Sequence, residues 1–466
     1  MHDSKKRRVA EQVKHFRSRF VQSAGAALGD ALPRHLLMQW VAEECGRWRE
    51  RLYGPLQTLL LFIEQVLGAD HSCQDTVARG VSARVARGQA MCSLNSGPYC
   101  KARQRLALGL IERIGREVGG KLCSEQPAQW LWRGRQIKLV DGTTVSTPDT
   151  PENQACFPQS REQKPGLGFP LVRLVAIVSL SCGAVLEWAS GPCEGKSTGE
   201  TALMWQLAHQ LKPGDIVIAD RFYTSYFLIA LLRSLSIDIV MRQHQRRHTD
   251  FRRGWRQGVR DHIVMWDRPP RPAWMSKETY MAMPESLTMR EVRSGGWTLV
   301  STLLDATQVS KQELAELYCQ RWNIELDLRA IKSVMQMDVL RCKSPPMVRK
   351  EIAVHLLAYN LVRSVMAQAA YMADVSPRRL SFKAALQMLR AFEENLRYCP
   401  HGRLSVQQAC LIAGIAQCRL PHRSGRVEPR EVKRRPKPRR LLTKPRKVMR
   451  EKLVKQQQRR IDAGLR

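Results

Sequence analysis

The sequence predicts an α/β fold built on a mixed β-sheet. Short apolar runs that are rich in β-branched residues have the length of strands, and segments with helical spacing separate the later runs. The order of three strands, a helix, a strand, a helix and a strand is typical of an α/β core. The strand-like runs are residues 137–140, 172–180, 184–189, 216–219 and 237–241, and the helical segments are residues 200–211 and 225–235.

A stretch of different character divides this core in two. Residues 242–304 are dense in Arg and Pro and contain four Trp, and we expect them to form a β-rich insertion. The first part of the core is then residues 133–241 and the second part is residues 305–395. The second part opens with helical periodicity over residues 310–337, which predicts one long helix.

The two ends of the chain have their own composition. Residues 1–132 contain helical periodicity and many Arg and Lys, which indicates a basic helical domain. Residues 396–466 form a basic tail. Beyond residue 423 the tail is so rich in Lys, Arg and Pro that it cannot bury enough apolar surface to fold alone, so we expect disorder toward its end. Such a tail is either simply solvated or also contacts phosphates.

The charge of the chain indicates a polyanionic partner. Lys and Arg number 76 against 42 Asp and Glu, which gives a net charge of +34. The apolar runs are well short of the roughly 20 residues that span a bilayer, and no secretory signal pattern follows the basic N-terminus. Nucleic acid and an anionic membrane surface are both partners of this kind, and we expect the protein to stay in the cytoplasm. The 13 Cys include no Cys-x-x-Cys pair and fit neither a disulfide scaffold nor a zinc site.

Two aspartates directly follow strand-like runs. Asp141 comes after residues 137–140, and Asp220 comes after residues 216–219. Both are expected at the carboxyl ends of strands, which is the edge of an α/β sheet where ligand sites form. Either aspartate alone could equally be a turn or helix-capping residue. On neighbouring strands, however, the two carboxylates would lie close together.

The helix predicted at residues 310–337 carries polar side chains on one narrow face. At about 100° per residue, four of them fall within about 60° of one another, beside an apolar stripe that would pack on the sheet. An ordinary amphipathic helix with paired charges has a similar pattern. Asp327 points about 200° away from this face and is not a candidate. The four residues are Tyr318, Arg321, Glu325 and Lys332.

Asp141, Asp220 and Glu325 together form a set of ligands for hard cations. Clustered carboxylates repel and raise one another's pKa unless a cation compensates. Oxygen ligands without His or Cys suit Mg²⁺, and Mn²⁺ can substitute. Two such ions activate the attacking oxygen and stabilise the leaving oxygen in a displacement at phosphorus. Arg321 and Lys332 are placed to hold the flanking phosphates.

These motifs resemble the DDE transposases of bacterial insertion sequences. The motifs are Asp141 in Val-Asp-Gly-Thr-Thr, Asp220 in Ile-Ala-Asp-Arg-Phe-Tyr, and a Tyr-x2-Arg-x3-Glu-x6-Lys signature from Tyr318 to Lys332, which defines one branch (insertion sequence family four). The resemblance extends from about residue 45 to about residue 440. It implies an RNase H-like catalytic core, interrupted by a β-strand insertion ahead of the helix that bears Glu325.

The resemblance also implies cut-and-paste DNA transposition. Hydrolysis at an element end frees a 3′-hydroxyl, which in well-studied relatives attacks the opposite strand and forms a hairpin that is later opened and joined to target DNA. Tyr318, Arg321 and Lys332 are then expected to contact DNA phosphates. The implied partners are the terminal inverted repeats, read by the N-terminal domain with its basic stretch at residues 5–19, the target DNA, and a second copy of the chain in a synaptic homodimer.

Trp297 resembles an insertion-domain tryptophan that this family uses to stack on a base flipped from the duplex. Stacking contributes about 1 to 3 kcal/mol per base, which helps to offset the cost of unpairing. The alternative is a Trp packed inside the small core of the insertion. Trp255, Trp266 and Trp274 are either structural or part of an exposed binding surface.

Two other functions remain open from the sequence. One is an RNase H-like nuclease that cuts without joining. The other is a DNA-binding protein derived from a transposase that is no longer catalytic. Three acidic residues argue against the second function, because a DNA-binding protein uses Lys and Arg and has no need for clustered acids.

Overall fold

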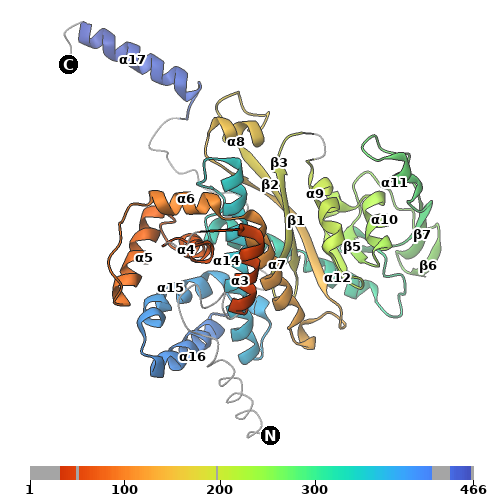
Figure 1. The fold of residues 1–466 in the computed structure, drawn as a ribbon. Coiled ribbons are helices and arrows are strands. Elements are labelled where there is room, and N and C mark those ends of the chain that lie inside the picture. Colours follow the sequence, from red (N-terminus) through yellow and green to blue (C-terminus); the bar gives the residue numbers. More distant parts are fainter. Residues whose placement is uncertain (1–31, 49–51, 196–197, 422–440, 463–466) are drawn as a thin grey trace.

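The structure, a computed structural model, describes residues 32–48, 52–195, 198–421 and 441–462. The basic stretch at residues 5–19 lies outside the described residues. A nine-stranded mixed sheet runs through the described part of the molecule, and helices cover its two faces (Figure 1). The expected α/β class with a mixed sheet is therefore confirmed.

Five strands correspond to the five strand-like runs of the sequence. β2 pairs antiparallel with both β1 and β3, whereas β4 lies parallel to both β1 and β5. The sheet therefore contains strands that run in both directions. β1 lies between an antiparallel neighbour, β2, and a parallel neighbour, β4. The five strands are β1 (Ile137–Ser146), β2 (Leu171–Ser179), β3 (Val185–Pro192), β4 (Ile216–Ala219) and β5 (Asp238–Arg242).

The segment that the sequence marks as a β-rich insertion extends the same sheet. Its last strand, β9, pairs antiparallel with β5, and the remaining strands follow outward in the order β3-β2-β1-β4-β5-β9-β8-β7-β6. A buried ion pair between Arg290 and Asp261 joins two of these strands. The elements are β6 (Trp255–Gly258), β7 (Asp261–Asp267), α11 (Lys277–Met281), β8 (Ser286–Ser294) and β9 (Trp297–Ser301).

Alternating side chains divide the sheet between two apolar cores, because successive residues of a strand point to opposite faces. Leu139 and Ile218 belong to the core that includes residues of α7 and α14. Val140 and Val217 belong to the other core, which includes residues of α9 and α10. The sheet is thus the middle of three layers. The helices named here are α7 (Leu108–Ser124), α9 (Glu200–Leu207), α10 (Tyr226–Ser234) and α14 (Pro345–Met372).

Helices from both ends of the chain share the larger core. α14 is buried along most of its length and contacts α4, α7 and α16 (Figure 1). In the described part of the chain, no helix has the length and apolar content needed to cross a membrane. The other helices of this layer are α3 (Arg34–Cys45), α4 (Pro55–Leu67), α5 (Cys73–Ala86), α6 (Gly97–Arg105), α15 (Phe382–Tyr398) and α16 (His401–Gln417), and short helices in the connections include η1 (Ala128–Trp130), α8 (Pro151–Cys156), η2 (Ala208–Gln210), η3 (Arg221–Tyr223) and η5 (Pro377–Arg379).

The basic tail, residues 396–466, contains two helices that its composition does not predict. α16 packs into the larger core through Leu411, Ile412 and Ile415. α17 (Arg446–Asp462) begins directly after Pro445, and nearly all of its described side chains are exposed. Figure 1 draws it apart from the main body. The difference has a simple reason: Lys, Arg, Glu and Gln are good helix formers, so a helix can form there without burying an apolar face. Residues 422–440 and 463–466 of the tail lie outside the described residues.

The helical layer approaches the sheet most closely where α7 and α14 meet β3. The Asn360 side chain of α14 accepts a hydrogen bond from the Val185 N–H at 2.8 Å and donates to the Val185 carbonyl at 2.7 Å. Gly119 of α7 makes this contact possible. A Cβ added at Gly119 would stand only 2.5 Å from the Val185 carbonyl oxygen and 2.9 Å from Asn360 Nδ2.

We predict that Gly119→Ala destabilises the fold by about 1 to 3 kcal/mol, because a methyl group at this contact forces the helix and the strand apart. Gly120→Ala is a matched control in the same helix, since an added Cβ there meets nothing within 4 Å. The control should be neutral or stabilise by about 0.5 to 1 kcal/mol. Urea unfolding of the two variants checks the difference, and equal stability of both would show that the Gly119 contact does not limit packing.

Candidate active site

Asp141 and Asp220 lie next to each other on adjacent parallel strands. The register pairs Val140 with Ala219, and the two aspartates are the next residue on each strand. Asp220 ends its strand and caps η3, where its carboxylate accepts a hydrogen bond from the Phe222 N–H at 2.8 Å.

The expectation that Asp141 also ends its strand is wrong. β1 continues to Ser146, because residues 138–146 pair with the antiparallel strand β2 beyond the point where the parallel strand β4 stops. Asp141 is therefore a mid-strand residue, half-buried and fixed by backbone pairing on its β2 side. It still stands at the carboxyl end of the parallel pair.

The long helix expected at residues 310–337 consists of three successive segments. They are α12 (Lys311–Cys319), α13 (Trp322–Arg329) and a π-helical turn, η4 (Ala330–Val334). The helix tightens at Gln320 and Arg321, whose N–H groups bond three residues back. α12 packs on β5 and α13 packs on β1, so the break allows consecutive segments to pack on different strands.

Arg321 connects the helix to the strand that carries Asp141. Its guanidinium donates to Glu325 Oε1 at 2.6 Å and lies 3.5 Å from Asp141 Oδ2. One helical segment later, the Lys332 ammonium donates to Thr143 Oγ1 at 3.1 Å. Asp141 and Thr143 are two residues apart on β1 and share a face. The predicted polar face of the helix therefore lies against this face of β1.

Burial and neighbouring charges change the acid–base properties of this cluster. Burial raises the pKa of Asp141 to about 6, and the charges of Asp220 and Glu200 add to the increase. The Gly142 N–H and the Arg321 guanidinium act in the opposite direction. For Arg321, burial alone would lower the pKa, but the hydrogen bond to Glu325 and the surrounding negative charge raise it above its ordinary value. The carboxylates and the guanidinium thus stabilise each other's charged forms.

Tyr318 and Trp297 lie together at the insertion side of the cluster. Their ring centroids are 6.1 Å apart in an edge-to-face arrangement, and the Arg242 guanidinium lies 5.3 Å from the Trp297 centroid. Tyr318 is buried, whereas 43% of Trp297 is exposed. The Trp that fills the core of the insertion is Trp266, which is buried. Trp297 therefore keeps an accessible surface.

The acidic residues do not by themselves form a compact metal site. Within the residues that the structure describes, no group of three or more His, Cys, Asp or Glu side chains is gathered closely enough to hold a metal ion. Arg321 lies between Asp141 and Glu325. Asp141 and Glu325 nevertheless share one positively charged partner, the Arg321 guanidinium. Carboxylate oxygens of this kind suit hard divalent ions.

Comparison with known proteins identifies the family. A family model described as "Transposase DDE domain" matches residues 132–361, which include β1, β4 and α13. The transposase InsG of insertion sequence element IS4 from Escherichia coli K12 is 29% identical over 350 residues, which cover 72% of this chain and 76% of that protein. The chain is therefore a transposase with a DDE domain, similar to the transposase of IS4. This transposase is an enzyme of a class that generally requires a divalent metal ion.

Other relatives match shorter parts of the transposase. The putative transposase InsL of element IS186A from Escherichia coli K12 is 28% identical over 108 residues, which cover 22% of this chain and 29% of that protein. A solved piggyBac transposase synaptic complex with hairpin DNA covers 88% of each chain at 11% identity, with a TM-score of 0.40. A similarity at that level carries no argument about this transposase.

Glu200 adds a fourth carboxylate beside the cluster, and it is not among the residues that the sequence predicts for the site. It is the first residue of α9, and its Oε2 lies 3.3 Å from the Tyr223 hydroxyl, which donates to it. Burial raises the pKa of Glu200, and the charge of Asp220 contributes to the same increase. Glu200 therefore lies within electrostatic reach of the predicted acids.

Gly142 allows Glu200 to approach from the α9 side of the sheet. Asp141 faces α13, so the next residue of β1 faces α9. A Cβ at Gly142 would stand 2.3 Å from Cδ and 2.4 Å from Oε1 of Glu200. Glycine inside a strand often marks a close approach by another group. The Gly that follows Asp141 is therefore the sequence signal that could have revealed the contact, although it does not name Glu200.

We predict that Gly142→Ala and Glu200→Ala each slow the cleavage of element-end DNA about ten-fold, the lower end of the range for residues that support a metal site. In Gly142→Ala the new methyl group displaces the Glu200 carboxylate, a change that a flexible side chain absorbs with little loss of stability. The double variant should be no slower than Glu200→Ala alone, because the methyl group then meets no carboxylate. A double-mutant cycle on single-turnover rates measures this coupling, and strictly additive losses would contradict it.

Proposed function

We propose that this transposase cleaves the ends of its element and joins them to target DNA in a metal-dependent, cut-and-paste reaction. Asp141, Asp220 and Glu325 are its catalytic residues and metal ligands. The observation that carries the proposal is the position of Arg321, which contacts both Asp141 and Glu325 while Asp220 follows the strand paired with β1. Two acids from distant parts of the sequence thus contact one positively charged group, and the third follows the neighbouring strand.

The donor set favours Mg²⁺ as the bound ion, with Mn²⁺ as a substitute, because all proposed ligands are carboxylate oxygens. When bound, such ions activate the attacking oxygen and stabilise the leaving oxygen in a displacement at phosphorus. Glu325 has a half-exposed side chain, and its present partner is Arg321. The accessible Glu325 carboxylate can exchange that guanidinium for another cation.

The cations and aromatic side chains around the acids suit a DNA substrate. Arg321 can bind a phosphate bidentately, and Lys332 can bind one as a point charge. Tyr318 completes the proposed phosphate contacts. Trp297 is accessible between the Arg242 guanidinium and Tyr318, and its exposed face is available for stacking on an unpaired base.

The wider architecture follows from the same proposal. Strands β1 to β5 with their helices are the RNase H-like core, and β6 to β9 are the insertion that precedes the helix with Glu325. The two parts of this core are residues 133–241 and 305–395, and residues 1–132 form the domain that reads the terminal inverted repeats. Two copies of the chain would assemble on a pair of element ends, since both ends must be cut and joined.

The experiment that tests this function uses the purified full chain, a duplex carrying one end of its element, a target duplex and Mg²⁺. Denaturing gels then size the products. Cleavage at the element end and a joined product support the proposal. Cut ends without any joined product would indicate a nuclease, and binding without Mg²⁺-dependent cleavage would indicate a DNA-binding protein. Chelation of the metal should stop both cleavage and joining while the DNA remains bound.

Removal of any proposed ligand should stop the chemistry without releasing the DNA. We predict that Asp141→Ala, Asp220→Ala and Glu325→Ala each reduce the single-turnover cleavage rate by at least about 100-fold, the loss expected when a group that stabilises transition-state charge is removed. DNA affinity, measured by a mobility shift, should stay close to that of the wild type. Glu316→Ala is a matched control, because Glu316 is an exposed acid on α12 outside the cluster. Near-wild-type cleavage by one of the first three variants would remove that residue from the site.

Trp297 should affect one step of the reaction more than the others. We predict that Trp297→Ala lowers the rate of hairpin formation about ten-fold, in line with the stacking energy of one base, while the first strand cleavage is nearly unchanged. Trp255→Ala is the control, since Trp255 is an exposed Trp of the same insertion with 61% of its surface accessible. Separate quantification of nicked and hairpin products checks this, and equal hairpin rates in both variants would assign Trp297 a structural role.

A further inference from the structure

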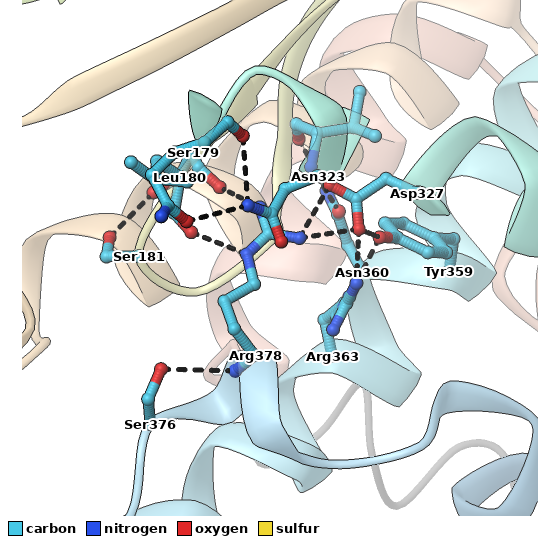
Figure 2. A network of polar contacts seen from close by, with 12 residues as sticks. Ser179, Leu180, Ser181, Asn323, Asp327, Tyr359, Asn360, Arg363, Ser376 and Arg378 are labelled. Carbon is cyan, nitrogen blue, oxygen red and sulfur yellow. Dashed lines mark hydrogen bonds and ion pairs between the residues drawn. The ribbon is translucent and has the colours of Figure 1, made fainter. Parts of the chain in front are cut away.

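Asp327 is a fully buried acid on the helix that carries Glu325. Its carboxylate has an exposed fraction of 0% and receives several hydrogen bonds (Figure 2). Arg378 Nη1 lies 2.7 Å from both carboxylate oxygens, the Tyr359 hydroxyl donates at 2.9 Å, and Arg363 Nη2 also donates. We name Asp327, Tyr359, Arg363 and Arg378 the Asp327 clamp.

The Asp327 clamp joins three parts of the fold. Tyr359 and Arg363 belong to α14, and the Arg363 Nε donates to the Tyr359 hydroxyl at 2.8 Å. Arg378, from η5, also donates to the carbonyls of Ser179 at 2.7 Å and Leu180 at 2.5 Å, at the end of β2. In Figure 2, Arg363 and Arg378 point toward Asp327, and Arg378 also points toward Ser179 and Leu180. α13, which carries Glu325, is thus connected by hydrogen bonds to α14 and, through Arg378, to the end of β2.

α13 needs such an anchor because it has little structure of its own to define its rotation. It is eight residues long, with a tightened turn before it and a π-helical turn after it. Helices this short are marginal without tertiary contacts. Ile324 and Leu328 contribute apolar contacts, which hold the helix to the core but have no preferred direction. Hydrogen bonds to a buried carboxylate are directional.

The position of Asp327 makes it effective for this purpose. It follows Glu325 by two residues, so the two side chains point about 200° apart around the helix. A rotation of about 10° would move a carboxylate that stands roughly 6 Å from the helix axis by about 1 Å. A misplacement of about 1 Å can cost about 100-fold in rate. An anchor on the buried side therefore limits movement on the active-site side.

We propose that Asp327 is a positioning residue that sets the rotation of α13 and so holds Glu325 toward Asp141. The proposal rests on the proposed role of Glu325. A purely stabilising role is the competing explanation. Buried ion pairs are poor evidence for net stability, because desolvation of the charges offsets their attraction, and the best-attested benefit of such groups is a defined register. The Asp327 clamp has that character, since its donors come from α14 and η5, which are separate from α13.

The test compares Asp327→Asn with a matched ion-pair variant, Glu64→Gln. Glu64 and Arg397 form a buried pair 3.2 Å apart that links α4 and α15, within the helical layer. Both substitutions replace a carboxylate of a buried ion pair with an amide. Asp327→Asn leaves Arg363 and Arg378 without their shared carboxylate, whereas in Glu64→Gln Arg397 keeps Glu393 as a partner. Four quantities are measured for the full-length chain: the melting temperature, the affinity for element-end DNA, the single-turnover cleavage rate of prebound DNA, and hydrogen exchange of the backbone amides of residues 322–329.

In Asp327→Asn we expect the cleavage rate to fall about 10- to 100-fold and exchange in residues 322–329 to rise, with DNA affinity nearly unchanged. Both substitutions should lower the melting temperature, but Glu64→Gln should leave both the cleavage rate and the exchange of α13 close to the wild type. Arg378→Lys keeps the positive charge and loses the fork that reaches the β2 carbonyls, so it should show the same pattern in milder form. It also serves as the second variant if Asp327→Asn does not fold.

Three outcomes would overturn the proposal: a wild-type cleavage rate in the Asp327 variant, unchanged exchange of residues 322–329, or an equal loss of rate in Glu64→Gln. If Asp327→Asn does not fold, the same criteria apply to Arg378→Lys. Glu325→Ala in the same assay separates this failure from failure of the proposed function. An inactive Glu325→Ala beside a fully active Asp327→Asn rejects only the positioning role. Absence of cleavage by the wild type, or full cleavage by Glu325→Ala, rejects the proposed function itself.

Discussion

The Arg321 guanidinium contacts the carboxylates of both Asp141 and Glu325. This contact joins the two parts of the core that the insertion separates in the sequence. Arg321 lies on the helical segment after the insertion, and Asp141 lies on the first strand of the sheet. Backbone pairing of β1 with β4 adds Asp220 to the same edge. Neither half of the core contains the whole set. The site can therefore exist only when β1, β4 and the segment around Arg321 are folded together.

Negative charge at this edge comes from both faces of the sheet. Asp141 meets the helix with Glu325 on one face, while Glu200 reaches across Gly142 from the other. Burial and mutual repulsion raise the pKa values of Asp141 and Glu200, which would favour neutral acids in the absence of cations. The Arg321 guanidinium opposes that tendency for Asp141. An edge of this kind attracts cations.

Local patterns in the sequence predict those features of the fold that depend on neighbouring residues. The apolar runs before Asp141 and Asp220 predict two strands, and helical periodicity predicts that Arg321 and Glu325 share a face. Features that depend on distant pairing could not be found in this way. β1 extends past Asp141 because β2 pairs with it, and the long helix breaks between α12 and α13, which pack on different strands. Glu200 approaches the site only once α9 packs across the sheet, and no spacing within the sequence encodes that contact.

Carboxylate–arginine pairs lie on both sides of α13, but they differ in their exposure to solvent. On each side a carboxylate meets arginine: Glu325 meets Arg321, and Asp327 meets Arg363 and Arg378. Solvent makes the difference. The Glu325 side chain is 35% exposed, so water can replace a departing partner at little cost. Asp327 has no exposed surface and is paired with two arginines, so only the loss of both would leave an uncompensated buried charge. The helix therefore has a fully buried ion-pair network on one side and a partly exposed ion pair on the other.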